Sequence, residues 1–310
     1  ARRRLKAKSA APNDASAGLV KLLDWANLDS IYQAFRKRIR SIDFIDDVAA
    51  WKSLHGWTIP KERNAFEFKQ WRGLTIPDHL FKFYETCLLL LLRKFADPLP
   101  SWILGFQPER QTLEISGGIS ALLAGAQEWS LSVVVGSVDV RTAFDDMVAN
   151  HLLDGLRDRR CPLSLQVAIM REFCELSFSS SINGSPPTRP VPMFKGGRQG
   201  GPATPELWNT ELCAALVPLY HRWDTDPVFA VHVPAPARNH EDFKLSPMQV
   251  WADNIYFVSP SIPIAFQMLE QLRDALAQIQ KFIKARSISF LPSQCALDRH
   301  CDITLGPLLC

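Results

Sequence analysis

A β-branched apolar run that ends on an acid constrains this chain more than any other feature of its sequence. Residues 131–140 contain five valines and carry an aspartate, Asp139, next to their end. Valine favours extended backbone, and an apolar run of this length is typical of a buried strand. The sequence therefore predicts a buried strand over Leu131–Val140 that delivers a carboxylate to its end.

A second acid lies in the middle of an apolar segment 114 positions later (253 − 139). In residues 248–259, Asp253 and Asn254 separate two apolar arms, and both residue types tolerate a tight turn. We expect a β-hairpin with Asp253 and Asn254 at its tip. The apolar residues of the following segment recur at helical spacing, which predicts a helix from Ile262 to Ile283.

The remaining pattern is mostly helical. Before Pro98 the only extended piece expected is Trp57–Lys61, and further helices are predicted over residues 80–95, 113–129 and 143–159. Another helix is expected to start at Thr204, where this threonine and Pro205 supply an N-cap and a first-turn proline. The order strand, helix, helix, hairpin, helix predicts an α+β domain with an antiparallel sheet covered on one face.

The two acids support two interpretations. If the strand and the hairpin are neighbours in one sheet, Asp139 and Asp253 converge, and two carboxylates in an apolar sheet repel each other unless cations neutralise them. Hard oxygen ligands select Mg²⁺ or Mn²⁺, and a pair of such ions is the standard machinery for in-line phosphoryl transfer. Patterning alone leaves open the simpler alternative, in which both residues are ordinary turn aspartates.

Charge and cysteine content exclude a few classes of protein. The formal net charge of +3 is far below that of a protein whose whole surface tracks nucleic acid. The seven cysteines include no CxxC pair and support neither a disulfide framework nor a zinc ribbon, so we expect an intracellular protein with reduced thiols. The longest apolar run, residues 87–92, is far shorter than the roughly 20 residues of a membrane span, so no membrane partner is expected.

Six segments, in order, resemble motifs of the reverse transcriptases of the non-LTR retrotransposon and group II intron lineage. Residues 137–145 resemble the first palm motif, an aspartate (Asp139) followed by an aromatic residue (Phe144) and a second aspartate (Asp145). The other matches are residues 71–76 with Lys82 to the RPIxL…K fingers segment, 105–112 to GFRPGRST, 197–209 to RQGxPxSP, 251–254 to the YADD box and 287–297 to GLxLNxxK. Together they cover about residues 57–297.

This resemblance implies an RNA-directed DNA polymerase of a retroelement, with the fingers and palm of a right-hand fold. The antiparallel palm sheet would pack on helices, and the thumb would be absent or truncated. The implied divisions are a basic flexible tail over residues 1–20, a mostly helical fingers-like segment over 21–130, a palm over 131–297 and a tail over 298–310. The implied partners are an RNA template, a DNA primer and a deoxynucleoside triphosphate, with no membrane.

The resemblance also implies which residues hold metal. Asp139 would ligate both Mg²⁺ or Mn²⁺ ions, Asp253 would be the second acidic ligand, and the Val140 carbonyl would add a backbone oxygen. Asn254, where the YADD box has its second aspartate, offers a neutral oxygen and removes one negative charge from the catalytic set.

Further residues would bind the nucleotide. Phe144 would be a steric gate against the 2′-hydroxyl of the incoming sugar, and without the resemblance it would be as readily a buried core aromatic. Arg198, Gln199 and Gly200 would form the wall beside the nascent base pair, with the glycine allowing a close approach of the backbone. A last pair, Lys61 and Arg72, would hold the triphosphate.

Three departures from the family pattern favour a second hypothesis. Besides Asn254, Leu291 replaces the asparagine and Gln294 the lysine of the last motif, and that lysine would neutralise the pyrophosphate leaving group. Water or Lys284 could take over its role. The alternative function is a catalytically impaired reverse-transcriptase-like module that binds nucleic acid or a protein partner.

Overall fold

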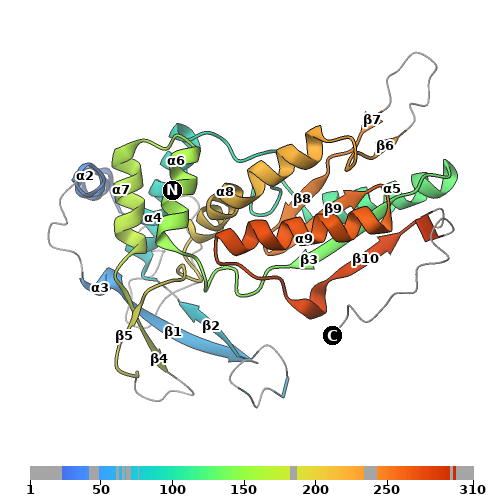
Figure 1. Ribbon diagram of the computed structural model, residues 1–310. Helices are drawn as coiled ribbons and strands as arrows, with labels where there is room; N and C mark the ends of the chain where they lie inside the picture. The colour runs from blue at the N-terminus through green and yellow to red at the C-terminus, as the bar shows by residue number, and fades with distance from the viewer. Residues whose placement is uncertain are drawn as a thin grey trace. The chain divides into compact units, whose positions relative to one another are not determined.

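The structure is a computed structural model that describes residues 23–41, 49–60, 63–64, 67, 71–75, 77–181, 187–233, 243–293 and 296–297. The chain divides into two units. Unit 1 comprises residues 1–98 and 144–211, and unit 2 comprises residues 99–143 and 212–310. Both units mix helices with one four-stranded sheet, which agrees with the α+β class predicted from the sequence (Figure 1).

The sheet of unit 2 is antiparallel and has the strand order β10-β3-β9-β8. The predicted strand is β3, Val134–Asp139, and the predicted hairpin is formed by β8, Met248–Trp251, and β9, Asn254–Ser259. At the edge lies β10, Ser289–Pro292, which the GLxLNxxK-like segment supplies. Strand and hairpin are therefore neighbours in one sheet, as expected.

The two faces of this sheet differ in burial because side chains alternate along each strand. One face is buried and carries Val138, Ile255 and Phe257. On the other face Val135 is also buried, but Ser137 and Asp139, nearer the end of the strand, are only partly covered. On the buried face the Phe257 ring lies over Gly136, where an added Cβ would come within 2.2 Å of the ring. Glycine at this position therefore lets the aromatic core close over the strand.

Helix α9, Ile262–Gln278, covers the buried face and packs against β3 and β9 (Figure 1). Its N-cap is Ser261, whose hydroxyl accepts a hydrogen bond from the Ile264 N–H. The predicted helix end at Ile283 was wrong, because Gln280 adopts a left-handed φ of 58° and the next N–H, that of Lys281, bonds back to Leu276 at 2.8 Å. This pattern of bonds is a Schellman-type termination.

The hairpin turn also differs slightly from the prediction. Because Trp251 pairs with Asn254, the two turn residues are Ala252 and Asp253, and Asn254 is the first residue of β9. Ala252 takes a positive φ of 57°, a conformation that costs an alanine about 1 kcal/mol or more. Backbone strain of this kind is often retained next to functional residues.

Unit 1 contains a mixed sheet that the sequence did not predict. Its strand order is β2-β1-β4-β5, with a parallel pairing between β1 and β4. The extended piece expected at Trp57–Lys61 is part of a longer strand, and its partner at residues 71–75 comes from a region expected to be mostly helical. The strands are β1, Ser53–Pro60; β2, Trp71–Thr75; β4, Leu176–Ser181; and β5, Val191–Met193.

The helices of unit 1 lie beside one another, with α7 contacting α2, α4 and α6 (Figure 1). The helix predicted over residues 143–159 begins only at Ala149, because residues 141–146 form turns in which Thr142 takes a positive φ of 47°. The bounds are α2, Trp25–Arg40; α3, Ala49–Lys52; α4, His79–Phe95; α6, Ala149–Asp158; and α7, Leu163–Phe173.

The long helix α8, Thr204–Thr225, starts at the predicted residue in unit 1 and ends in unit 2. The other elements of unit 2 are α5, Thr112–Glu128; β6, His232–Val233; β7, Phe243–Lys244; and the short 3₁₀ helix η3, Ala285–Ser287. The predicted domain bounds at residues 20, 130 and 297 stay predictions.

Candidate active site

The partly covered face of the unit 2 sheet brings the two predicted acidic positions together. Asp139, the last residue of β3, pairs with Asn254, the first residue of β9, and the Val140 N–H donates to the Asp253 carbonyl at 2.7 Å. The hairpin tip therefore lies directly beside the end of β3. Two residues separated by more than a hundred positions become neighbours, because antiparallel pairing aligns the end of one strand with the start of the next.

The Asp139 carboxylate forms an ion pair with Lys284. The Nζ atom of Lys284 lies 2.6 Å from both Oδ1 and Oδ2 of Asp139. The side chains of Lys284 and Asp139 are 42% and 25% exposed. The Lys284 N–H also donates to the Asp139 carbonyl at 2.9 Å, and Ser287 Oγ accepts from the Asp139 N–H at 3.0 Å. The segment that carries Lys284 is thus fastened to the backbone of β3.

Tyr256 on β9 lies close to the Asp253 turn. It follows Asn254 by two residues and shares its sheet face. Burial first, and then the charge of Asp253, raise the pKa of the Tyr256 hydroxyl above its ordinary value.

A loop segment supports the hairpin from its outer side. The Val250 carbonyl of β8 accepts hydrogen bonds from the N–H groups of Leu104 and Gly105, at 2.9 and 3.2 Å. A Cβ added to Gly105 would lie 2.3 Å from the backbone nitrogen of Ala252, which is part of the turn. This position is within the GFRPGRST-like segment, so the motif provides the close backbone approach that keeps the strained turn in place.

The other candidate residues of the described chain gather in unit 1. Phe144 is half-buried, with its ring centroid 6.1 Å from that of Trp208, and its carbonyl accepts from the Gly197 N–H at 2.7 Å. Gln199 donates from Nε2 to the Asp145 carboxylate. The RQG-like loop is therefore bonded to the turn at the end of the first motif.

Gly200 and Arg198 in this loop have different environments. Gly200 has a φ of 141°, and a Cβ there would meet the Thr75 carbonyl oxygen at 2.3 Å, so only glycine fits. Arg198 is 3% exposed, with its guanidinium 3.8 Å from the centroid of the Phe81 ring and its Nη2 donating to the Trp51 carbonyl at 2.7 Å. Its side chain faces the interior of unit 1, where it can position the loop but is covered from solvent.

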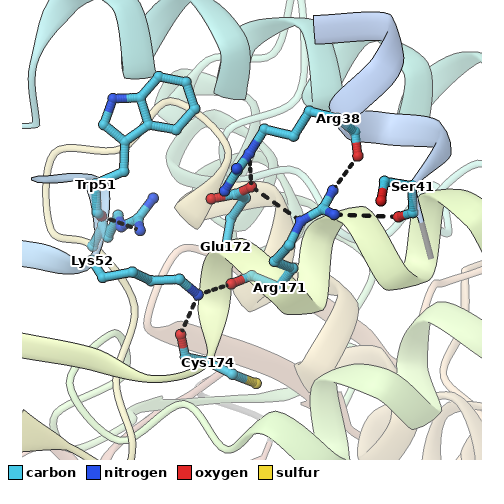
Figure 2. A network of polar contacts seen from close by, with 8 residues as sticks. Arg38, Ser41, Trp51, Lys52, Arg171, Glu172 and Cys174 are labelled. Carbon is cyan, nitrogen blue, oxygen red and sulfur yellow. Dashed lines mark hydrogen bonds and ion pairs between the residues drawn. The ribbon is translucent and has the colours of Figure 1, made fainter. Parts of the chain in front are cut away.

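Trp51, which accepts the hydrogen bond from Arg198, lies next to a buried polar network (Figure 2). Glu172 accepts from Arg38 Nε at 2.8 Å, and Arg171 donates to the carbonyls of Arg38 and Ser41. Lys52, adjacent to Trp51, donates to the carbonyls of Arg171 and Cys174. These bonds tie α2, α3 and the end of α7 together, so the loop that contacts Trp51 is anchored to three helices.

The two remaining nucleotide-binding candidates cannot be placed in the same way. Lys61 lies outside the described residues, as does Gln294. Arg72 contributes backbone to β2, where it pairs with Ile59, and its side chain lies outside the described part.

The sequence comparison decides the family. The sequence model of the family "Reverse transcriptase (RNA-dependent DNA polymerase)" matches residues 59–297, which is more than half of the chain. The chain belongs to this reverse transcriptase family. A search of curated protein sequences gave no match.

Membership of the reverse transcriptase family agrees with the motif order, which covers nearly the same residues as the match. It implies that the domain is of the kind that binds a nucleic-acid template and a primer. Among the described residues no helix is both long and apolar enough to cross a membrane.

The residues at this edge of the sheet carry the oxygen atoms that a divalent cation prefers. The backbones of Asp139, Asp253 and Asn254 meet there, and the Asp139 carboxylate binds the Lys284 ammonium through both of its oxygens. Within the described part of the chain, no group of three or more His, Cys, Asp and Glu side chains could hold a metal ion. Two carboxylates and neutral oxygens are therefore the most that the described site offers.

Sequence reasoning missed the roles of Lys284 and Gly105. The motif pattern suggests Lys284 only as a replacement for the lysine expected at position 294, and a helix that continues to Ile283 gives no reason for Lys284 to contact Asp139. The signal for Gly105 was present in the GFRPGRST-like motif, but only the structure relates it to the hairpin turn.

Proposed function

We propose that this chain is the RNA-directed DNA polymerase of a retroelement of the non-LTR or group II intron lineage, with fingers and palm. It would transfer a nucleotidyl group from a deoxynucleoside triphosphate to a primer 3′-hydroxyl inside the cell. The observation that carries the proposal is the pairing of Asp139 with Asn254 in one antiparallel sheet, directly beside the turn residue Asp253. It supports the proposal because nucleotidyl transfer depends on positioning and on charge neutralisation.

In this proposal Asp139, Asp253 and the Val140 carbonyl hold Mg²⁺ or Mn²⁺, and Asn254 contributes a neutral oxygen. Two bound ions would neutralise the charge that develops on the phosphoryl group and on the attacking and leaving oxygens. The protein's own contribution is the fixed backbone of the site, because the Val140 N–H and the Asp253 carbonyl hold the strand end and the hairpin tip in register.

The unit 1 loop would form the nucleotide site. Phe144 would sit beneath the sugar as a gate, and Gln199 and Gly200 would line the base pair, with Arg198 holding this loop from the interior. Lys61 and Arg72 would bind the triphosphate. The partners would be an RNA template and a DNA primer.

Primer extension on an RNA template tests the proposal. We expect Asp139→Asn to abolish extension, because the variant loses a carboxylate that the ions require. The matched control is Asp154→Asn, which makes the same change at an exposed helix position paired with Arg157. Equal extension by the Asp139 variant and the native chain would refute the catalytic role.

One observation favours a second function. Asn254 stands where a second carboxylate is expected, and a lysine neutralises Asp139, as in a palm that binds nucleic acid or a protein without catalysis. Asn254→Asp separates the two functions. In a polymerase it should raise extension and the thermal stabilisation by Mn²⁺, whereas in a non-catalytic module it adds an unneutralised charge, lowers stability and leaves Mn²⁺ without effect.

A further inference from the structure

Lys284 binds the Asp139 carboxylate through both of its oxygens. The Nζ–Oδ distances are 2.6 Å each, which is the geometry of a strong charge-assisted pair. A divalent ion at Asp139 would need the same oxygens. An ammonium and a divalent ion at one carboxylate exclude each other both by space and by charge repulsion.

The backbone around Lys284 is fixed independently of its side chain. The Arg141 N–H donates to the Phe282 carbonyl at 2.7 Å, and the Lys284 N–H donates to the Asp139 carbonyl at 2.9 Å. Any residue other than proline at position 284 keeps these bonds. The lysine stem is flexible and 42% exposed, so its ammonium can swing into solvent without unfolding the segment.

We propose that Lys284 is a tethered counter-cation of the catalytic carboxylate. It neutralises Asp139 while no metal is bound, competes with the divalent ion for the two carboxylate oxygens, and is displaced when the ion binds. This inference rests on the proposed function, because it assumes a metal site at Asp139. In addition to that function, Lys284 would raise the metal concentration that is needed to fill the site.

Competition between Lys284 and the metal predicts that removing the lysine ammonium has opposite effects on fold stability without metal and on metal binding. Removing the ammonium leaves Asp139 beside Asp253 without its counter-charge, so the fold should be less stable in a chelator. The same removal frees the carboxylate, so metal should bind more tightly. A residue with a purely structural role would produce only the first effect.

The experiment measures Mn²⁺ binding to the purified chain by the electron paramagnetic resonance signal of free Mn²⁺, and thermal unfolding in EDTA and in Mn²⁺. We expect Lys284→Met to tighten Mn²⁺ binding by at least about threefold, as expected for loss of a partly exposed ion pair. Its melting temperature should fall below that of the native chain in EDTA and rise more than that of the native chain on adding Mn²⁺.

Two variants serve as controls. Arg286→Met removes an equally charged, exposed side chain in the same turn, and it measures the general effect of losing one positive charge. Lys284→Arg keeps a cation at the position and should retain the native Mn²⁺ affinity more closely than Lys284→Met. Tightening that is specific to Lys284→Met supports the counter-cation.

The possible failures are distinguishable. Equal Mn²⁺ affinity in the native chain and Lys284→Met, or equal tightening in Arg286→Met, overturns the competition while the metal site stands. Absence of Mn²⁺ binding in every variant, with Asp139→Asn behaving like the native chain, overturns the metal site and the counter-cation together.

Discussion

Glu85 is expected to make the fold less stable as the pH rises towards neutrality. Its carboxyl group on α4 is buried, and burial raises its pKa from 4.5 to about 7 despite the opposing attraction of the Arg198 guanidinium. Glu172 raises the pKa further, whereas Lys82 lowers it. Within the described residues Oε2 has no hydrogen-bond partner, so ionisation at this site is poorly compensated.

The sign of the effect follows from linkage. A carboxyl group with a higher pKa in the folded chain than in the unfolded chain binds its proton more tightly when folded. Its stabilising contribution is complete below the unfolded value of 4.5 and is lost as the pH rises through the folded value of about 7. With about 1.4 kcal/mol for each pKa unit, the contribution lost between pH 5 and pH 8 is roughly 2.5 kcal/mol.

The test compares Glu85→Gln with the native chain, because glutamine resembles the protonated carboxyl group and cannot ionise. Urea unfolding followed by tryptophan fluorescence would give the free energy of unfolding at several pH values between 5 and 8. The difference between variant and native chain should shift in favour of the variant by roughly 2.5 kcal/mol from pH 5 to pH 8, while contributions from other groups cancel.

Glu114→Gln is the matched control, since this helix glutamate is exposed and its pKa is lowered by the hydrogen bond from the Gln111 N–H and by Arg110. A lowered pKa changes stability only at more acidic pH. The reasoning would be refuted if the free energy of unfolding of Glu85→Gln stayed below that of the native chain by a constant amount, or by an amount that grew with pH. Such a result would mean that Glu85 is ionised throughout and bound to Arg198.

Three further predictions concern the hairpin, the sugar gate and the core. Gly105→Ala should lower the melting temperature and primer extension together, since its Cβ would lie 2.3 Å from a backbone nitrogen of the hairpin turn. An unchanged melting temperature and unchanged extension would contradict the supporting role of Gly105. Phe144→Ala should admit ribonucleotides in an extension assay, and unchanged sugar discrimination would return this ring to a core role. Arg159→Met should cost about 3 kcal/mol in urea unfolding, because it removes a buried guanidinium that bonds Glu206, Thr210 and the Asp97 carbonyl, although Arg93 remains paired with Glu206. Arg157→Met at an exposed pair should cost less than about 0.5 kcal/mol.

The sheet that carries the acids could be predicted because its signals are local. The valines of β3 and the two apolar arms of the hairpin each specify a strand, and Asp139 marks where the first one ends. Motif order then related the strand to the hairpin. The structure agrees that the strand and the hairpin are neighbours in one sheet, and it adds the register, in which Asn254 lies opposite Asp139.

The errors arose where a single backbone conformation changed the path of the chain. Gln280 and Thr142 both adopt positive φ, and each ends a pattern that helical periodicity would continue or start. Neither residue type signals a left-handed conformation in the way glycine does. The mixed sheet of unit 1 was missed for a different reason, since the parallel pairing of β1 with β4 joins segments more than a hundred positions apart.

The early end of α9 has a consequence for the charge of the site. Because the helix stops at Gln278, the chain returns along β3 and brings Lys284 onto Asp139. The ammonium cancels the charge of Asp139, and its displacement would restore that negative charge next to Asp253. In the proposed metal site, metal binding and release of the lysine would therefore be linked by charge, because each exposes or neutralises the same carboxylate.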